Sequence, residues 1–170
     1  MEDLPPREYC DYLVTVFLTH LSPLFDIVHG PTFQEQCAHF VQDPLAVSLS
    51  WLALLFVICA SALSTAEEND PALTNFRAMQ KDNQQMDNFS FSRKLFAATF
   101  TCLSQDRFFS NHDLSTLEAL LLAIYVTCHS EGVERGWGLL GTASNIGIAL
   151  RRNTGSKRGT VVDSERRRRY

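Results

Sequence analysis

Residues 51–63, WLALLFVICASAL, are apolar on every side of a helix. A helix of this kind must be enclosed by other helices or by lipid. The uncharged run around it, residues 45–66, is long enough to cross a bilayer, but serine and threonine residues dilute both of its ends. The strongly apolar part has a length typical of a buried core helix, and no cluster of Lys or Arg flanks it. We therefore interpret residues 51–63 as the central helix of a protein core.

The composition fits one globular domain. Of the 170 residues, 45% are apolar and 11% are aromatic, which is enough to bury a substantial core. The cysteines are odd in number, lie far apart and fall mostly within apolar helical pattern: Cys10, Cys37, Cys59, Cys102 and Cys128. They indicate reduced, buried thiols of an intracellular protein. No basic stretch followed by an apolar run opens the chain, so we see no secretory signal.

The charge is divided between an acidic body and a basic tail. The whole chain carries a net charge of −4, yet residues 151–170 hold eight of its 15 Lys and Arg residues and only two of its 19 acidic residues. An acidic surface is repelled by phosphate, so the body is not expected to bind nucleic acid, and any such contact would come from the tail.

Apolar residues recur at helical spacing through most of the chain. We expect helices at residues 7–20, 33–41 and 92–103. A fourth helix is expected to contain residues 117–128. The apolar pattern of the last helix covers residues 136–150, and we expect this helix to end at residues 153–155. Thr32 with Glu35, and Ser115 with Glu118, have the spacing of capping boxes, and Ser90 or Ser92 is expected to cap the helix at residues 92–103. Residues 66–90 are polar and are interpreted as a loop with one weak helix at most.

The last two helices are expected to form an antiparallel hairpin. The final helix carries small and apolar residues on one face, which lets another helix approach closely: Gly136, Leu140, Ala143, Gly147 and Leu150. No segment of useful length has the period of a strand. The pattern predicts an all-α fold, an irregular multi-helix bundle around the central apolar helix, with a helical domain at residues 4–150. Residues 151–170 are expected to be a basic tail that is flexible or starts a truncated helix.

Three segments together resemble a known family. LPPREYCDYLVTVFLTHLSPLFDIVHGPTF, SWLALLFVICASAL and LEALLLAIYVTCHSEGVERGWGLLGTASNIGIAL resemble successive parts of the fungal-specific transcription factor domain. That domain is the regulatory middle homology region of fungal binuclear zinc cluster activators. The run ERRRR at residues 165–169 resembles the family's next block. The resemblance implies a role in transcription, a partial version of the regulatory domain, and control of a metabolic or biosynthetic gene set.

The sequence departs from the family in two ways. The family's zinc cluster needs six closely spaced cysteines, whereas this chain has no Cys-x-x-Cys, so we expect no direct DNA binding from it. The family's domain also continues beyond ERRRR, and its usual Gly-Leu-His is replaced by Arg151, Arg152 and Asn153. The product is expected to be truncated at both ends. Apolar faces of its central helices would then be uncovered, which predicts self-association, binding to a full-length zinc-cluster regulator, or poor solubility.

No residue pattern supports a metal site, a cofactor site or catalysis. The spacing of His20, His29, Cys37 and His39 matches no zinc motif. His112 and His129 could be paired with Glu118 and Glu131 as acid and base, but nothing supplies a nucleophile or oxyanion donors. We therefore assign no metal, no cofactor and no enzyme activity. Trp51 and Trp137 could line a ligand pocket, but are interpreted as core residues.

The basic tail contains a candidate nuclear-import patch: Lys157, Arg158, Arg166, Arg167, Arg168 and Arg169. An equally weighted interpretation is that these residues form the solvated first turn of a family helix. We expect a nuclear protein, with a cytoplasmic one as the alternative, that regulates transcription through protein contacts. Two other hypotheses stay open: a membrane-associated helical protein with spans at residues 45–66 and 117–129, and a non-functional truncated regulator. A helical scaffold unrelated to transcription is a further alternative.

Overall fold

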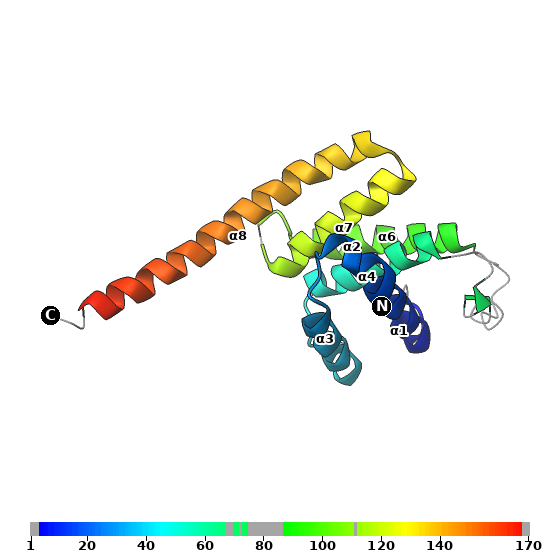
Figure 1. Cartoon of the computed structure of the whole chain (residues 1–170), viewed down its shortest axis with the longest axis horizontal. Coiled ribbons are helices and arrows are strands. Elements are labelled where there is room, and N and C mark those ends of the chain that lie inside the picture. The colour runs from blue at the N-terminus through cyan, green and yellow to red at the C-terminus, as the bar shows by residue number, and fades with distance from the viewer. Residues whose placement is uncertain (1–3, 67–69, 72, 75–86, 111, 168–170) are drawn as a thin grey trace.

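The computed structural model describes residues 4–66, 70, 71, 73, 74, 87–110 and 112–167, with side chains described as far as residue 152. The described chain is helical: α1 (Arg7–Val16), η1 (Phe17–Leu21), α2 (Ser22–Phe25), α3 (Gly30–Gln42), α4 (Leu49–Thr65), α6 (Asn88–Gln105), α7 (Leu114–Ser130) and α8 (Val133–Arg167). Figure 1 shows these helices gathered around α4, with α8 extending away from the bundle. Within the described ranges no residue forms a strand, so the predicted all-α fold is confirmed.

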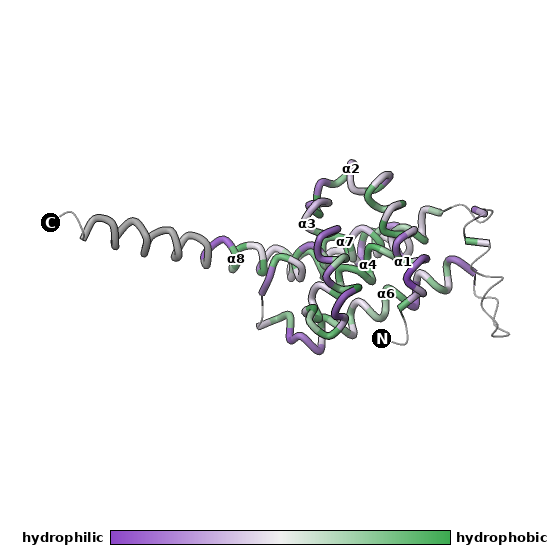
Figure 2. The backbone as a smooth tube through the Cα atoms, turned by 90° about the horizontal axis from the view of Figure 1, so that it is seen from below, coloured by the Kyte–Doolittle hydropathy of each residue, from purple (hydrophilic) through white to green (hydrophobic). Residues whose placement is uncertain are grey.

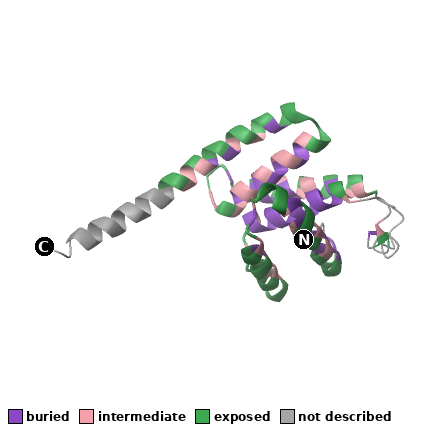
Figure 3. Ribbon diagram, viewed as in Figure 1, coloured by how far each residue is buried: buried purple, intermediate pink, exposed green. Residues whose placement is uncertain are grey.

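Helix α4 is the centre of the core. Every residue from Ser50 to Leu63 is buried, which confirms the predicted enclosed helix. Helices α6 and α7 pack along α4, and α1 and η1 contact it as well. Buried residues accordingly cluster where these helices meet in Figure 3, and the tube through α4 is hydrophobic in Figure 2. The predicted uncovered apolar faces therefore do not include α4, because neighbouring helices surround it.

The serine and threonine hydroxyl groups of α4 form hydrogen bonds within the bundle. The Ser48 side chain caps the helix by accepting a hydrogen bond from the Trp51 amide. Ser61 Oγ donates to the carbonyl of Val57 at 2.7 Å, four residues earlier on the same helix. Such bonds allow hydroxyl groups to be buried in an apolar helix at little cost. In the part of the chain that the structure describes, no helix combines the length and apolar content needed to span a membrane.

The first predicted helix is interrupted by a π-helical turn. Residues 7–20 were expected to form one helix, whereas the structure has α1, then η1, then the short helix α2. Its buried stripe includes Leu13, Phe17 and Leu21, as the spacing predicts. Pro23 lies in the first turn of α2, a position where its missing amide costs nothing, and Asp26 ends α2 in the left-handed conformation.

The predicted caps of three helices are wrong. Helix α3 starts at Gly30 with His29 at the N-cap, so Thr32 lies inside the helix, and its hydroxyl is 2.8 Å from His29 Nδ1. Pro31 explains the earlier start, because its fixed φ and missing amide suit the first helical turn. The side chains of Asp113 and Asp87 cap α7 and α6, in place of Ser115 and of Ser90 or Ser92.

Helices α7 and α8 form the predicted antiparallel hairpin (Figure 1). Gly132 lies in the turn at φ 102°, a conformation that residues with a side chain rarely adopt. The predicted end of the last helix at residues 153–155 is wrong, since the backbone of α8 stays helical to Arg167. A lone glycine such as Gly155 weakens a helix by only about 1 kcal/mol and does not by itself end it. The predicted loop at residues 66–90 falls largely outside the described residues.

Candidate functional site

One face of α8 packs against α7. Ala143 and Ile146 are buried there, and the two glycines of this face lie close to side chains of α7. A Cβ added at Gly136 would lie 2.5 Å from Cys128 Sγ, and one added at Gly147 would lie 3.9 Å from Leu117 Cδ2. These contacts confirm the predicted stripe of small residues with one exception. Leu140 does not belong to it, because its side chain is exposed.

A second side of α8 carries exposed apolar residues. We call Val133, Trp137, Leu140 and Ile148 the α8 apolar face. The last three residues lie four, seven and 15 positions after the first, and these spacings place all of them on one side of an α-helix. Trp137 is 66% exposed and Val133 is 62% exposed. Figure 3 shows this helix as exposed along its outer side. A row of large apolar side chains without cover is typical of a protein-contact surface.

Opposite charges lie at the two ends of the α8 apolar face. Glu134 lies at its start, and Arg151 and Arg152 lie where the described side chains end. Glu131, in the turn before α8, does not add to this charge, because Arg135 Nη1 donates to Glu131 Oε2 at 2.6 Å and neutralises it. The face is therefore acidic where α8 begins and basic where it leaves the bundle.

The two tryptophans have opposite environments. Trp51 is buried and packs against two rings of α3, with centroids 5.8 Å from Phe33 and 5.2 Å from Phe40. It is a core residue, as predicted. The same prediction for Trp137 is wrong, because the α7–α8 contact uses the other side of α8. The sequence contained a signal for this surface: α8 has two apolar stripes, and only one can face α7.

The structure does not bring the candidate metal ligands together. His20 Nδ1 lies 3.2 Å from the Val16 carbonyl, His29 is bonded to Thr32, and Cys37 lies in a groove between α1 and α3. His39 is exposed on α3. Across the described ranges, no three His, Cys, Asp or Glu side chains group in a way that could hold a metal ion.

None of the five cysteines, all of which the structure describes, forms a disulfide, and three of them are buried. Cys10, Cys59 and Cys102 are buried, whereas Cys37 and Cys128 are partly exposed. Cys10 Sγ lies 3.3 Å from the Pro5 carbonyl. Burial raises the pKa of Cys37 to about 12, with the charge of Asp11 adding to the effect, and a hydrogen bond with Cys10 raises the pKa of Cys59. Because only the thiolate is nucleophilic, these thiols are poorly suited to covalent chemistry.

The candidate acid–base residues are also separated. His112 Nε2 contacts the Phe109 carbonyl at 3.0 Å, and the His129 ring lies against Tyr125, 5.3 Å between centroids. Glu131 is paired with Arg135. Glu118 lines a small cleft together with His29. Burial raises the pKa of Glu118 to about 7, and the negative charge of Asp113 adds to this effect. Its predicted capping role is wrong, since Asp113 is the cap of α7.

The candidate nuclear-import patch stays a prediction. Lys157, Arg158, Arg166 and Arg167 belong to the part of α8 for which only the backbone is described. Arg168 and Arg169 lie outside the described residues.

Residues 14–170 match the model of the family described as "Fungal specific transcription factor domain". Similar curated proteins include the Aurofusarin cluster transcription factor aurR2 of Gibberella zeae, 27% identical over 97% of this chain, and Transcription factor phm2 of Pyrenochaetopsis sp, 26% identical over 88% of it. An uncharacterized transcriptional regulatory protein of Schizosaccharomyces pombe is 27% identical over 86% of the chain. The aligned regions make up 24%, 20% and 22% of these three proteins, so the chain spans about a quarter of their length or less. No solved structure matches. The chain belongs to the fungal specific transcription factor domain family.

Proposed function

We propose that the chain regulates transcription in the nucleus by pairing, through the α8 apolar face, with a second copy of the same domain. That copy can be an identical chain or the matching domain of a full-length regulator. The observation that supports this proposal is the exposed row of large apolar side chains on α8, which includes Trp137. Exposed tryptophans in such rows are frequent anchors of protein interfaces.

The charges at the ends of the face favour a second copy as the partner. If two α8 helices pair antiparallel about their midpoint near Thr142, the acidic start of each lies beside the basic end of the other. Such a two-fold pairing uses the same surface on both partners. The overall acidic composition of residues 1–150 supports contact with protein rather than with the phosphates of DNA.

Sedimentation equilibrium of the purified chain tests the pairing. We expect a concentration-dependent dimer for the native chain and a monomer for the double variant Trp137→Ser, Ile148→Ser. Leu45→Ser is the matched control, because Leu45 is 87% exposed and lies outside the α8 apolar face. A native chain that stays monomeric, or a dimer that the double variant leaves intact, contradicts the proposed surface.

The proposed target is a metabolic or biosynthetic gene set. Support comes from the Gibberella zeae relative, whose name describes it as a cluster transcription factor. Deleting the coding sequence should change the transcripts of a co-regulated set of genes, as measured by RNA sequencing. Unchanged transcripts, together with failure to co-purify with a full-length regulator of this family, would contradict the proposal.

Nuclear entry is proposed to depend on the basic residues of the tail. A fluorescent fusion of the chain should accumulate in the nucleus. Replacing Lys157, Arg158 and Arg166 to Arg169 with alanine should leave it distributed through the cell. If the substituted fusion still accumulates in the nucleus, these residues are not the import signal.

A further inference from the structure

A cleft of about 500 Å³ lies between α6 and the turn that joins α7 to α8. Helices α6 and α7 both pack along α4 but contact one another little, so their side chains leave space where the first half of α6 faces the end of α7. This volume is within the range of small-molecule sites, roughly 300–1,000 Å³. The cleft is separate from the α8 apolar face and has no part in the function proposed above.

One wall of the cleft is apolar. It is formed by Phe89 and Phe96 from α6 and by the buried Val126 from α7. The Phe96 ring is held edge-on by Phe100, 5.2 Å away between centroids, whereas Phe89 is 55% exposed. A flat apolar molecule could therefore cover Phe89 and remove its ring from water.

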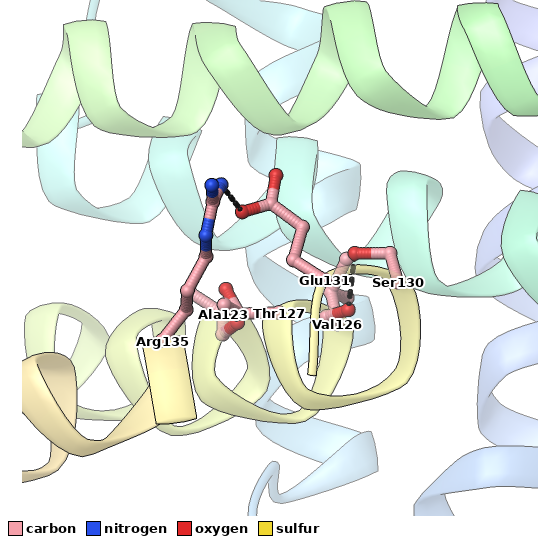
Figure 4. A network of polar contacts seen from close by, with 6 residues as sticks. All are labelled: Ala123, Val126, Thr127, Ser130, Glu131 and Arg135. Atoms are coloured by element: carbon pink, nitrogen blue, oxygen red, sulfur yellow. Dashed lines mark hydrogen bonds and ion pairs between the residues drawn. The ribbon is translucent and has the colours of Figure 1, made fainter. Parts of the chain in front are cut away.

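The polar end of the cleft has a net positive charge. The charged side chains that line it are Arg93, Arg135 and Glu131. Figure 4 shows Glu131 and Arg135 pointing from the α7–α8 turn towards the ribbon of α6, joined by their 2.6 Å ion pair. That ion pair neutralises Arg135, which leaves the charge of Arg93 as the excess.

Arg93 is the cation that remains for a ligand. Its guanidinium lies 5.9 Å from the centroid of the Phe89 ring, and over the described part of the chain it has no carboxylate partner. The hydroxyl groups nearby are already engaged with the backbone: Ser130 Oγ donates to the Val126 carbonyl and Ser64 Oγ to the Ser61 carbonyl, each at 2.8 Å. A guanidinium beside an exposed aromatic ring matches a carboxylate attached to a flat apolar body.

We propose that this cleft binds a small aromatic carboxylic acid. The carboxylate accepts hydrogen bonds from Arg93, and the ring lies against Phe89, Phe96 and Val126. A single negative charge on the ligand matches the single excess positive charge of the lining. The bound acid would connect α6 to the start of α8 by contacts with both sides of the cleft.

The test uses 2-naphthoate as the probe and the full chain, with binding measured by isothermal titration calorimetry. We expect saturable 1:1 binding that Arg93→Met weakens at least about tenfold, the size of one charge-assisted hydrogen bond. The neutral analogue 2-naphthamide should bind the native chain about tenfold more weakly than the acid does. Arg93 is exposed, so we expect Arg93→Met to keep the native helical circular dichroism.

Arg7→Met is the matched control, because Arg7 is an exposed arginine on α1 that pairs with Asp11 outside the cleft. It should leave the affinity for 2-naphthoate unchanged. Absence of saturable binding to the native chain would overturn the proposal. Equal affinity of Arg93→Met and the native chain, or of the acid and the amide, would overturn it as well.

Discussion

At the scale of single residues, the structure corrects the sequence most often at helix starts. The sequence offers several Ser, Thr and Asp residues near each start, and the capping-box spacing selects Ser115 for α7. In the structure the cap is Asp113, which accepts from the Thr116 amide at 2.6 Å and also from the Ser50 hydroxyl of α4. The bond to Ser50 connects positions 63 residues apart, so no local pattern could have indicated it.

Asp113→Ala should therefore lower the free energy of unfolding by about 1–2 kcal/mol, since it removes the cap of α7 and the hydrogen bond that Ser50 donates to Asp113. Ser115→Ala, at the cap position that the sequence suggests, should change stability by less than about 0.5 kcal/mol. Urea denaturation followed by circular dichroism measures both values. Equal effects of the two substitutions would contradict the assignment of Asp113 as the cap.

Glu118 should make stability depend on pH near neutrality. Its folded pKa of about 7 is above its ordinary value of 4.5, so the folded chain holds this proton to a higher pH than the unfolded chain does. The resulting contribution to stability is fully present below pH 4.5 and is lost as the pH rises through about 7.

Glu118→Gln should therefore be more stable than the native chain at pH 8, by about 1 kcal/mol once solvent screening of this half-buried group is included. The difference should disappear near pH 4.5. Thermal unfolding at both pH values measures it, with the exposed Glu134→Gln as control. A difference of the same size at both values would mean that Glu118 does not titrate as described.

At the scale of elements, the prediction succeeded where a long segment has one clear apolar pattern. Helix α4 is apolar all round, and every residue from Ser50 to Leu63 is buried. The prediction failed where one helix has two apolar stripes, because the sequence alone does not say which stripe is buried. Helix α8 carries two apolar stripes, and only the packing of Ala143 and Ile146 on α7 decides which one is buried. The π-helical turn at η1 has no local sequence signal.

The close approach of α7 and α8 can be tested at two glycines of α8. Gly136→Ala should be less stable than Gly138→Ala by about 1–2 kcal/mol, because its new methyl group would meet Cys128 Sγ. At Gly138 an added Cβ meets nothing within 4 Å, and alanine should stabilise the helix by up to about 1 kcal/mol. Chemical denaturation of both variants measures the difference. Adding Cys128→Ala should restore stability to Gly136→Ala, and absence of this rescue would argue against the contact.

At the scale of the whole molecule, the chain is a transcription factor domain rather than an enzyme, as its family membership establishes, and its described part is built from helices. The sequence predicted this family and fold because three long segments carry the resemblance in the family's order. It did not locate the surfaces, since the α8 apolar face depends on how α8 packs on α7, and the cleft at Arg93 depends on how α6 and α7 pack on α4. The α8 apolar face is the surface through which we propose that the molecule contacts its partner.

Acrylamide quenching of the two tryptophans tests that claim most directly, because one is buried in the core and the other lies on the face. In dilute solution, Trp51 should be protected and Trp137 quenched. As the protein concentration rises, the quenchable fraction should fall until both tryptophans are protected, because pairing covers Trp137. A quenchable fraction that stays constant up to the highest attainable concentration would contradict the account.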